Sequence, residues 1–227
     1  MAGTIAISSP FVYTNGDEVR EMKRDIVQQR IEEEIKRGPK NSIYVLADFY
    51  DAGNYEAVKK AVLRLTSEGK LLRVKRGIYE SPYYSSFLQE EVEASPLDVA
   101  KKIAKKNRWT IAPSGNTALN ALGLSTQVPA EYHFVSSGTN KEVDLGGIKL
   151  YFKHVPPKEI AGISAKSALI IEAIKALGRT GMDDSARAKI AGVLSSTEKE
   201  RLAHESKTSR VWVAEEIRKI LVVTCTR

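Results

Sequence analysis

The residues of this chain whose types and spacing could do chemistry are cations gathered in one short segment. Between Asn54 and Tyr79, seven basic side chains stand against two acidic ones, a net charge of +5 out of +7 for the whole chain. The basic residues are Lys59, Lys60, Arg64, Lys70, Arg73, Lys75 and Arg76, and the acidic ones are Glu56 and Glu68. Lys and Arg side chains neutralise backbone phosphates and set a protein's register on a duplex. The segment is therefore a candidate surface for double-stranded DNA.

The start of this segment also holds side chains that could read bases. Tyr55, Glu56 and Lys59 lie at the beginning of a predicted helix, the part that contacts base edges in helix-turn-helix proteins. One good bidentate contact is worth about 1–3 kcal/mol of discrimination, so one or two such residues suffice. The alternative is a surface helix whose lysines are merely solvated. DNA contact is favoured, because the hairpin that follows adds further cations.

A capped helix and a hairpin are the elements that must position these side chains. Asn54 can accept hydrogen bonds from the first helical turn, and Gly69 can take the positive φ with which helices often end. The runs 71–74 and 77–80 are strand-like and are joined by a basic turn at Lys75-Arg76. The apolar positions of the helix recur every three to four residues, at Val58, Ala61, Val62 and Leu65. The helix is therefore expected to bury one face and turn its cations to the other.

This helix and hairpin complete a winged helix-turn-helix, which we predict over residues 18–80. A long, highly charged helix is expected from Glu18 to Arg37, followed by a short helix over residues 43–49 and a tight turn. In this plan the helix after Asn54 is the recognition helix, and Lys75-Arg76 is the tip of the wing.

Three further segments complete the predicted organisation. Residues 1–17 show no helical or alternating period and are expected to form an N-terminal arm, and the serine- and acid-rich residues 81–94 a linker. Residues 95–227 are predicted to form a second domain. Its residues 148–154 alternate between apolar and polar side chains, as in a strand with one buried face. The chain is therefore predicted to be α+β, with an N-terminal winged helix-turn-helix followed by a small mixed-sheet domain whose C-terminal part is helical.

The composition argues against several classes of site and location. Cys225 is the only cysteine, so an intramolecular disulfide and a cysteine-based zinc module are excluded. His133, His154 and His204 are far apart in the sequence, so no metal site and no cofactor are predicted. No apolar run approaches the roughly 20 residues of a membrane span, and the first residues do not follow the pattern of a signal peptide. We therefore expect a cytoplasmic protein.

Three features of the second domain invite a catalytic interpretation. Ser114 follows a strand and opens a helix, but the glycine that a nucleophile elbow needs two residues earlier is missing, so helix capping is favoured. His133 and His154 lie on separate predicted strands and could face each other, with packing favoured over catalysis. Asp183 and Asp184 open a helix, where the helix dipole favours acidic residues. No catalytic set emerges, and an enzyme is not expected.

The most specific run in the chain lies between Ile111 and Ala130. Its distinctive residues are Pro113, Ser114, Gly115, Asn120, Gly123, Leu124, Ser125, Thr126, Gln127 and Pro129. This run resembles the signature of the bacterial AbiEi-like antitoxin family. The N-terminal half is also similar to that family, in the 58–65 helix, in Gly69-Lys70-Leu71 and in Arg76-Gly77-Ile78-Tyr79. The arm before Glu18 departs from it, because it matches no element of the family.

The resemblance implies a type IV toxin–antitoxin role in abortive infection, a form of phage defence. In that family the winged helix binds inverted repeats in the operon's own promoter and represses it. The C-terminal domain counteracts a cognate nucleotidyltransferase-like toxin. The alternative function is a free-standing winged-helix transcriptional regulator whose second domain senses a ligand or dimerises. The basic residues between Lys101 and Arg108 are interpreted as a solvated helix face, with extra DNA or toxin contact as the alternative.

Overall fold

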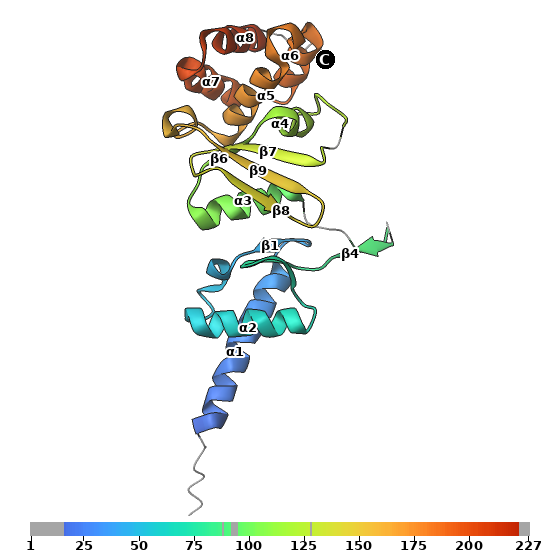
Figure 1. Cartoon of the computed structure of the whole chain (residues 1–227), viewed down its shortest axis with the longest axis vertical. Helices are drawn as coiled ribbons and strands as arrows, with labels where there is room; N and C mark the ends of the chain where they lie inside the picture. The colour runs from blue at the N-terminus through green and yellow to red at the C-terminus, as the bar shows by residue number, and fades with distance from the viewer. Residues whose placement is uncertain (1–15, 88, 92–94, 128, 223–227) are drawn as a thin grey trace, which may run out of the picture. The chain divides into compact units, whose positions relative to one another are not determined.

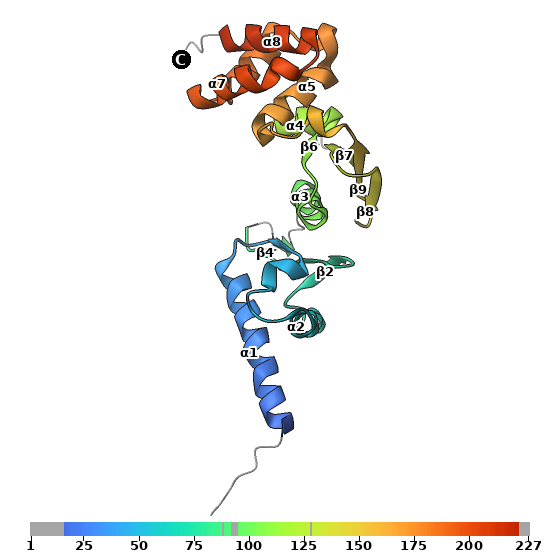
Figure 2. The same ribbon diagram turned by 90° about the vertical axis from the view of Figure 1, so that its left-hand side faces the viewer.

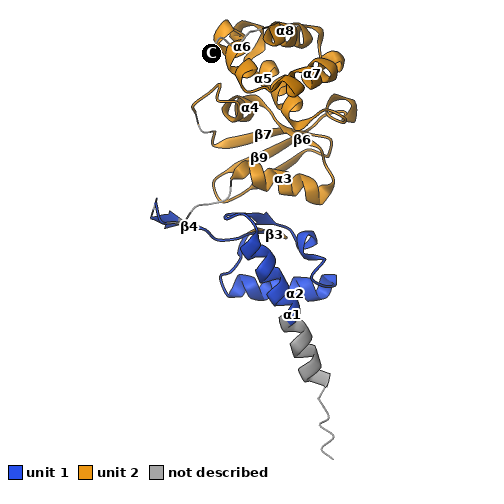
Figure 3. Ribbon diagram, turned by 180° about the vertical axis from the view of Figure 1, so that it is seen from behind, with its two compact units in different colours: residues 1–73, 79–93 blue, residues 74–78, 94–227 orange. Residues whose placement is uncertain are grey.

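The computed structural model describes residues 16–87, 89–91, 95–127 and 129–222 of an α+β protein (Figures 1 and 2). The chain divides into two compact units: residues 1–73 with 79–93, and residues 74–78 with 94–227 (Figure 3). The expected arm lies outside the described residues except for its last two, which begin a helix, and Cys225 also lies outside them. The segment 81–93, predicted as a linker, groups with the first unit.

The first unit holds the elements expected of a winged helix. They are α1 (Gly16–Arg37), β1 (Ile43–Tyr44), the 3-10 helix η1 (Leu46–Phe49), α2 (Tyr55–Ser67), β2 (Leu72–Lys75) and β3 (Ile78–Glu80). Residues 74–78, which run from the end of β2 through the turn to the first residue of β3, group with the second unit. The three strands form one sheet in the order β1-β3-β2. A small antiparallel hairpin follows, made of β4 (Tyr84–Ser85) and β5 (Glu90–Glu91).

The short helix predicted over residues 43–49 is wrong in its first half. Ile43 and Tyr44 form a strand that pairs with Glu80 and Tyr79 of β3. Helical turns begin only at η1. The N–H of Val45, the residue just before η1, donates a hydrogen bond to the carboxylate of Asp48 within it at 2.9 Å. Pairing with a strand more than thirty residues later decided the conformation, and local helix signals do not report such a partner.

Helix α2 forms where the sequence predicted it, and for the predicted reasons. The side chain of Asn54 accepts a hydrogen bond from Ala57 N at 3.0 Å, and Gly69, just beyond the helix, has φ +70°. The residues of its inner face, Val58, Ala61, Val62 and Leu65, are all fully buried. They pack with Phe49, Leu71 and Tyr79 into the core of the first unit.

Helix α1 packs against α2 through a narrow stripe of apolar side chains. Ile31 is fully buried, and Val27 and Ile35 pack against the same core, whereas Ile26 is 41% exposed. Positions 27, 31 and 35 are four apart, so they form a single row along the helix. From residue 26 to the end of the helix, the charged side chains of the other faces are exposed or half-buried, and the row at 27, 31 and 35 contributes one narrow apolar seam to the core.

The second unit is built on a mixed sheet. Its strands are β6 (Ile111–Pro113), β7 (Glu131–Ser136), β8 (Lys141–Asp144) and β9 (Lys149–His154), in the order β6-β7-β9-β8. β7 and β9 are parallel, with Phe134 opposite Phe152, and these two rings stack at 5.4 Å. The other two pairs are antiparallel. The predicted alternation in β9 is confirmed, because Leu150 and Phe152 are buried while Lys153 is exposed.

Helices complete the second unit on both sides of the sheet region (Figures 1 and 2). They are α3 (Pro96–Asn107), α4 (Gly115–Ala121), η2 (Pro157–Glu159), α5 (Ala165–Gly181), α6 (Asp184–Gly192), α7 (Ser196–Glu205), η3 (Ser206–Thr208) and α8 (Val211–Val222). α4 packs against β7, and α5 against β6. The buried residues of α5 to α8 form a separate helical core that includes Ile174, Ile190, Leu202 and Ile217. Among the helices of the described ranges, none is long and apolar enough to cross a bilayer.

Candidate nucleic-acid interface

The outer face of α2 carries the predicted base-reading residues. Tyr55 is 50% exposed, and Glu56, Lys59 and Lys60 are exposed beside it. The Lys59 ammonium lies 5.7 Å from the centre of the Tyr55 ring, and that ring meets Tyr50 edge-on at 6.4 Å. A cation this close to an aromatic face is attracted by the ring quadrupole. The first two turns of α2 therefore offer an aromatic and two cations on one accessible surface.

Two other cations of the charged segment are less available than their number suggests. Arg64 is only half-exposed. Lys70 forms ion pairs with Glu32 at 2.8 Å and with Glu68 at 2.9 Å, and these hydrogen bonds raise the pKa of its ammonium. Gln28 of α1 also donates to Glu68 at 3.0 Å. Lys70 thus neutralises acids between α1 and the end of α2, so the net charge of the segment overstates the cations open to a phosphate.

The predicted wing residues divide between the two units. Arg73 is exposed on β2 in the first unit. Lys75 and Arg76, also exposed, belong to residues 74–78 of the second unit, where Lys75 Nζ donates to the Asp144 carbonyl at 3.3 Å. The turn between the strands places Gly77 at φ +75°, a conformation that favours glycine. The hairpin is therefore confirmed, but its tip makes contacts that the sequence did not indicate.

The signature run has clear structural roles in the second unit. Pro113 ends β6, and the N–H of Ser114 donates to the His133 carbonyl at 2.8 Å. Ser114 occupies the N-cap position of α4, as expected, but its side chain makes no hydrogen bond to the first turn of the helix. Gly115 follows with φ +56°. These residues turn the chain from the sheet edge into a helix that packs on the sheet.

Asn120 holds the second half of the run in place. Its amide donates to the carbonyls of Ser125 at 3.4 Å and Gln127 at 3.1 Å, across the loop that follows α4. Gly123 starts this loop with φ +67°, and Leu124 packs partly against the helical core. The remaining members are the exposed Thr126 and the half-buried Pro129. One amide therefore fixes the loop, which explains several signature positions by structure alone.

The two histidines of the sheet do not face each other. His133 stacks on Tyr151 at 4.9 Å and lies 3.5 Å from Glu131, whereas His154 Nδ1 lies 2.7 Å from the Gly138 carbonyl. In the register of β7 and β9, His133 is opposite Tyr151 and His154 is opposite Ser136. Over the described part of the chain, no group of three or more His, Cys, Asp or Glu side chains could hold a metal ion.

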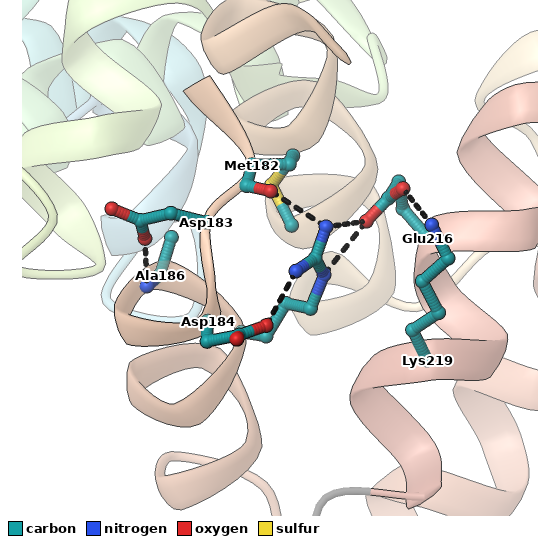
Figure 4. A network of polar contacts seen from close by, with 7 residues as sticks. Met182, Asp183, Asp184, Ala186, Glu216 and Lys219 are labelled. Carbon is teal, nitrogen blue, oxygen red and sulfur yellow. Dashed lines mark hydrogen bonds and ion pairs between the residues drawn. The ribbon is translucent and has the colours of Figure 1, made fainter. Parts of the chain in front are cut away.

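The paired acids at the start of α6 serve the helices (Figure 4). Asp183 accepts a hydrogen bond from Ala186 N at 2.7 Å, as an N-cap does. Asp184 pairs with Arg187 at 2.7 Å, and the same guanidinium contacts Glu216 of α8 at 2.9 Å. Glu216 also pairs with Lys219 at 2.7 Å. The acids therefore belong to a structural network rather than to a catalytic pair.

The sequence interpretation did not single out a set of cations that the structure brings together. Lys106 at the end of α3 and Lys141 on β8 line one cavity with Lys75 and Arg76. Lys106 was visible only as a member of a charged helix face, and Lys141 is an isolated lysine in a strand. A sequence signal for their proximity would have required the strand order, which places β8 at the edge of the sheet.

The comparisons with known proteins place this chain in a family. No curated protein matches it. It is similar to the crystal structure of the RV2827C protein from Mycobacterium tuberculosis, with 13% sequence identity and a TM-score of 0.44, over 88% of this chain and 76% of that one. The profile of the family of unknown function DUF6088 matches residues 30–202, which include α2, the hairpin, the mixed sheet and most of the helical part. The chain therefore belongs to the DUF6088 family.

Proposed function

We propose that this protein is a cytoplasmic type IV antitoxin and autorepressor. In this proposal α2 binds inverted repeats in the protein's own promoter, and residues 95–227 counteract a cognate nucleotidyltransferase-like toxin without catalysing a reaction. The observation that carries the DNA-binding part is the outer face of α2, where Tyr55, Glu56, Lys59 and Lys60 are exposed over a fully buried inner face. The antitoxin part is supported by the resemblance of residues 111–130 to the AbiEi-like signature.

The geometry of α2 suits a helix that enters a major groove. Its N-terminus is capped, so its first turn is rigid, and base contacts come from this end in helix-turn-helix proteins. Lys59 and Lys60 supply phosphate contacts, while Tyr55 and Glu56 are the candidates for base edges. The tie from Lys70 to α1 holds the far end of the helix against its neighbour.

A titration of salt against affinity tests this assignment. Lys59→Ala/Lys60→Ala in the full chain is expected to weaken binding to the upstream promoter duplex. Each lost phosphate contact removes about 0.9 from the slope of log affinity against log salt, so the double variant should lose about 1.8. The slope is measured by fluorescence anisotropy. Lys189→Ala/Lys207→Ala, which removes two exposed lysines of the second unit, is the matched control. Equal slopes for all three proteins would refute DNA binding by α2.

A second candidate function is the free-standing regulator with a ligand-sensing second unit. It rests on a cavity of about 260 Å³ in that unit, slightly below the roughly 300 Å³ at which pockets for whole small molecules begin, so only a small ligand would fit; Ile163, Ile171, Lys175 and Arg210 are in its lining. Co-expression with the neighbouring reading frame separates the two functions. An antitoxin restores growth when that neighbour is toxic, whereas a free-standing regulator has no such effect.

A further inference from the structure

A second basic surface lies within the second unit, around a cavity of about 190 Å³. It is formed by the hairpin tip at 74–78, the C-terminal end of α3 and the edge strand β8. Its lining residues are Lys75, Arg76, Ile78, Ile103, Lys106, Asn107, Lys141 and Val143. Four of the eight are cations and none is acidic, so the cavity is a place where an anion would be attracted.

The four cations have no carboxylate partner among the residues that the structure describes. Lys75 Nζ donates to the Asp144 carbonyl at 3.3 Å, and Lys106 Nζ donates to the Arg76 carbonyl at 3.4 Å. Lys141 Nζ lies over the Trp109 ring at 5.6 Å. These are contacts to carbonyls and to a ring, which orient the cations without neutralising them.

The nearby acid Asp144 is itself engaged by the backbone. Its Oδ1 accepts hydrogen bonds from Gly146 N at 2.8 Å and Gly147 N at 3.2 Å, and these lower the pKa of its carboxyl group. The Asp144 carboxylate interacts electrostatically with Lys75, but Asp144 is not among the residues that line the cavity. Four like charges around one space repel each other, and an entering anion would relieve that repulsion.

The walls of the cavity strengthen this attraction. Ile78, Ile103 and Val143 are 4%, 2% and 1% exposed, so one side of the space is apolar, while the four cations are exposed. An apolar wall of low dielectric concentrates the field of the cations and strengthens their attraction for an anion. The amide nitrogen of Asn107 donates to the Ile103 carbonyl at 2.7 Å, so the cations rather than this amide are the groups that face an anion.

The size of the cavity decides between ligand classes. Pockets that enclose a whole small molecule or cofactor have volumes of roughly 300–1,000 Å³, so about 190 Å³ is small for a complete nucleotide. A single phosphate group, contacted by several point charges, fits the space and the chemistry, since lysine binds phosphate as a point charge. Because Lys75 and Arg76 of the predicted wing line the same cavity, a phosphate already part of duplex DNA is the ligand that the surface suits.

We propose that this cavity binds a backbone phosphate of the DNA, with Lys106 and Lys141 completing a site begun by the hairpin tip. This inference rests on the proposed function, because it assumes that the protein binds duplex DNA. It adds that the second unit contributes to DNA affinity through α3 and β8. It also assigns a role to Lys106 and Lys141, which lie outside the winged-helix segment.

Removing the two lysines outside the hairpin tests the site in the full-length protein. Lys106→Ala/Lys141→Ala is expected to lower the salt slope for the promoter duplex by about 1.8, measured by fluorescence anisotropy between 50 and 200 mM salt. Raising the salt from 50 to 200 mM should therefore weaken DNA binding by the variant about 12-fold less than it weakens binding by the wild type. Lys106→Arg/Lys141→Arg, which keeps both charges, should keep the wild-type slope. Lys189→Ala/Lys207→Ala is again the control.

The outcomes separate this inference from the proposed function. If Lys59→Ala/Lys60→Ala flattens the slope and Lys106→Ala/Lys141→Ala does not, the cavity site is refuted while DNA binding by α2 stands. If the arginine variant flattens the slope as the alanine variant does, the lysines act through packing and the site is again refuted. If the wild type does not bind the duplex, both proposals fall. If only the cavity variant flattens the slope, the site stands and the role of α2 is refuted.

Discussion

Gly138 illustrates how one residue position is constrained by one neighbour. A Cβ atom added there would overlap the indole ring of Trp109, although the backbone at Gly138 is not in the left-handed region. The ring has little freedom to move away, because its edge meets Phe152 at 6.0 Å and Lys141 lies over its face. The requirement for glycine is therefore steric.

Gly138→Ala is expected to destabilise the second unit. The added methyl group must displace the half-buried Trp109, and overpacking of this kind costs about 1–3 kcal/mol. Thermal unfolding followed by tryptophan fluorescence measures the loss. Gly192→Ala is the matched control, because a Cβ there meets no atom within 4 Å and its φ is not positive.

Relief of the clash provides the internal check on this prediction. Adding Gly138→Ala to the Trp109→Leu variant should cost less stability than adding Gly138→Ala to the wild type, because the smaller side chain removes the clash. A Gly138→Ala protein that melts with the wild type would contradict the steric argument.

At the residue scale, the sequence did not predict which charged side chains pair with one another. Counting cations correctly located the basic segment at residues 54–79, but it could not show that Lys70 is paired with Glu32 from another helix. In the same way Lys141, isolated in the sequence, joins other cations only through the fold. Local composition reports charge, whereas availability depends on tertiary partners.

At the scale of elements, a buried ion pair links α6 to α8 (Figure 4). The side chains of Arg187 and Glu216 are 17% and 11% exposed, and the guanidinium also donates to the Met182 carbonyl at 2.6 Å. Burial raises the pKa of Glu216, but hydrogen bonds from Lys219 and Arg187 outweigh it, and the net pKa lies below the ordinary 4.5. The ionised carboxylate therefore stabilises the contact between the two helices.

Glu216→Gln should lower the free energy of unfolding at neutral pH by about 2 kcal/mol, because a buried guanidinium loses a charged acceptor. The pH dependence should change as well. A carboxyl group whose pKa is lowered by folding contributes stability above its unfolded pKa and loses it as pH falls through the folded pKa. Urea unfolding between pH 7 and pH 3 should therefore show a smaller acid-induced loss in the variant than in the wild type.

The matched control for this prediction is Glu215→Gln, an exposed position on the same helix. Other acids of the chain, such as Glu198 and Glu205, also have lowered pKa values, and they contribute equally to both proteins. An acid dependence of Glu216→Gln that equals that of the control would show that the ion pair does not couple α6 to α8.

Elements held by local signals were predictable, and those held by distant partners were not. Asn54 caps α2 and Asp183 caps α6, each from a position that the sequence marks as the start of a helix. By contrast, residues 43–44 became a strand because β3 was available to pair with them. Helix ends depend on residues within one turn, whereas a strand depends on another strand.

At the scale of the whole molecule, the fold class followed from the sequence, but the division of the hairpin did not. The α+β class is confirmed. Residues 74–78, read as a wing tip, group with the second unit. Periodicity identifies a hairpin, but it does not report which unit supplies its contacts.

Two separate cores predict that the two proposed activities can be separated by mutation. The core of the first unit includes Val62 and Leu65, and the cores of the second unit include Ile174 and Val135, with no shared residue. Removing exposed lysines from α2 leaves every one of these buried residues in place. Lys59→Ala/Lys60→Ala should therefore lose repression of a promoter reporter but still restore growth to cells that express the cognate toxin.

The converse variant sharpens the same prediction. Gly138→Ala acts on the second unit, so at a temperature where that unit is partly unfolded it should protect cells less well at equal protein level. Growth curves with matched expression from a foreign promoter measure both effects, and immunoblots establish the protein levels. If Lys59→Ala/Lys60→Ala abolished protection at wild-type abundance, the surface of α2 would itself take part in neutralising the toxin. The assignment of that activity to residues 95–227 would then be wrong.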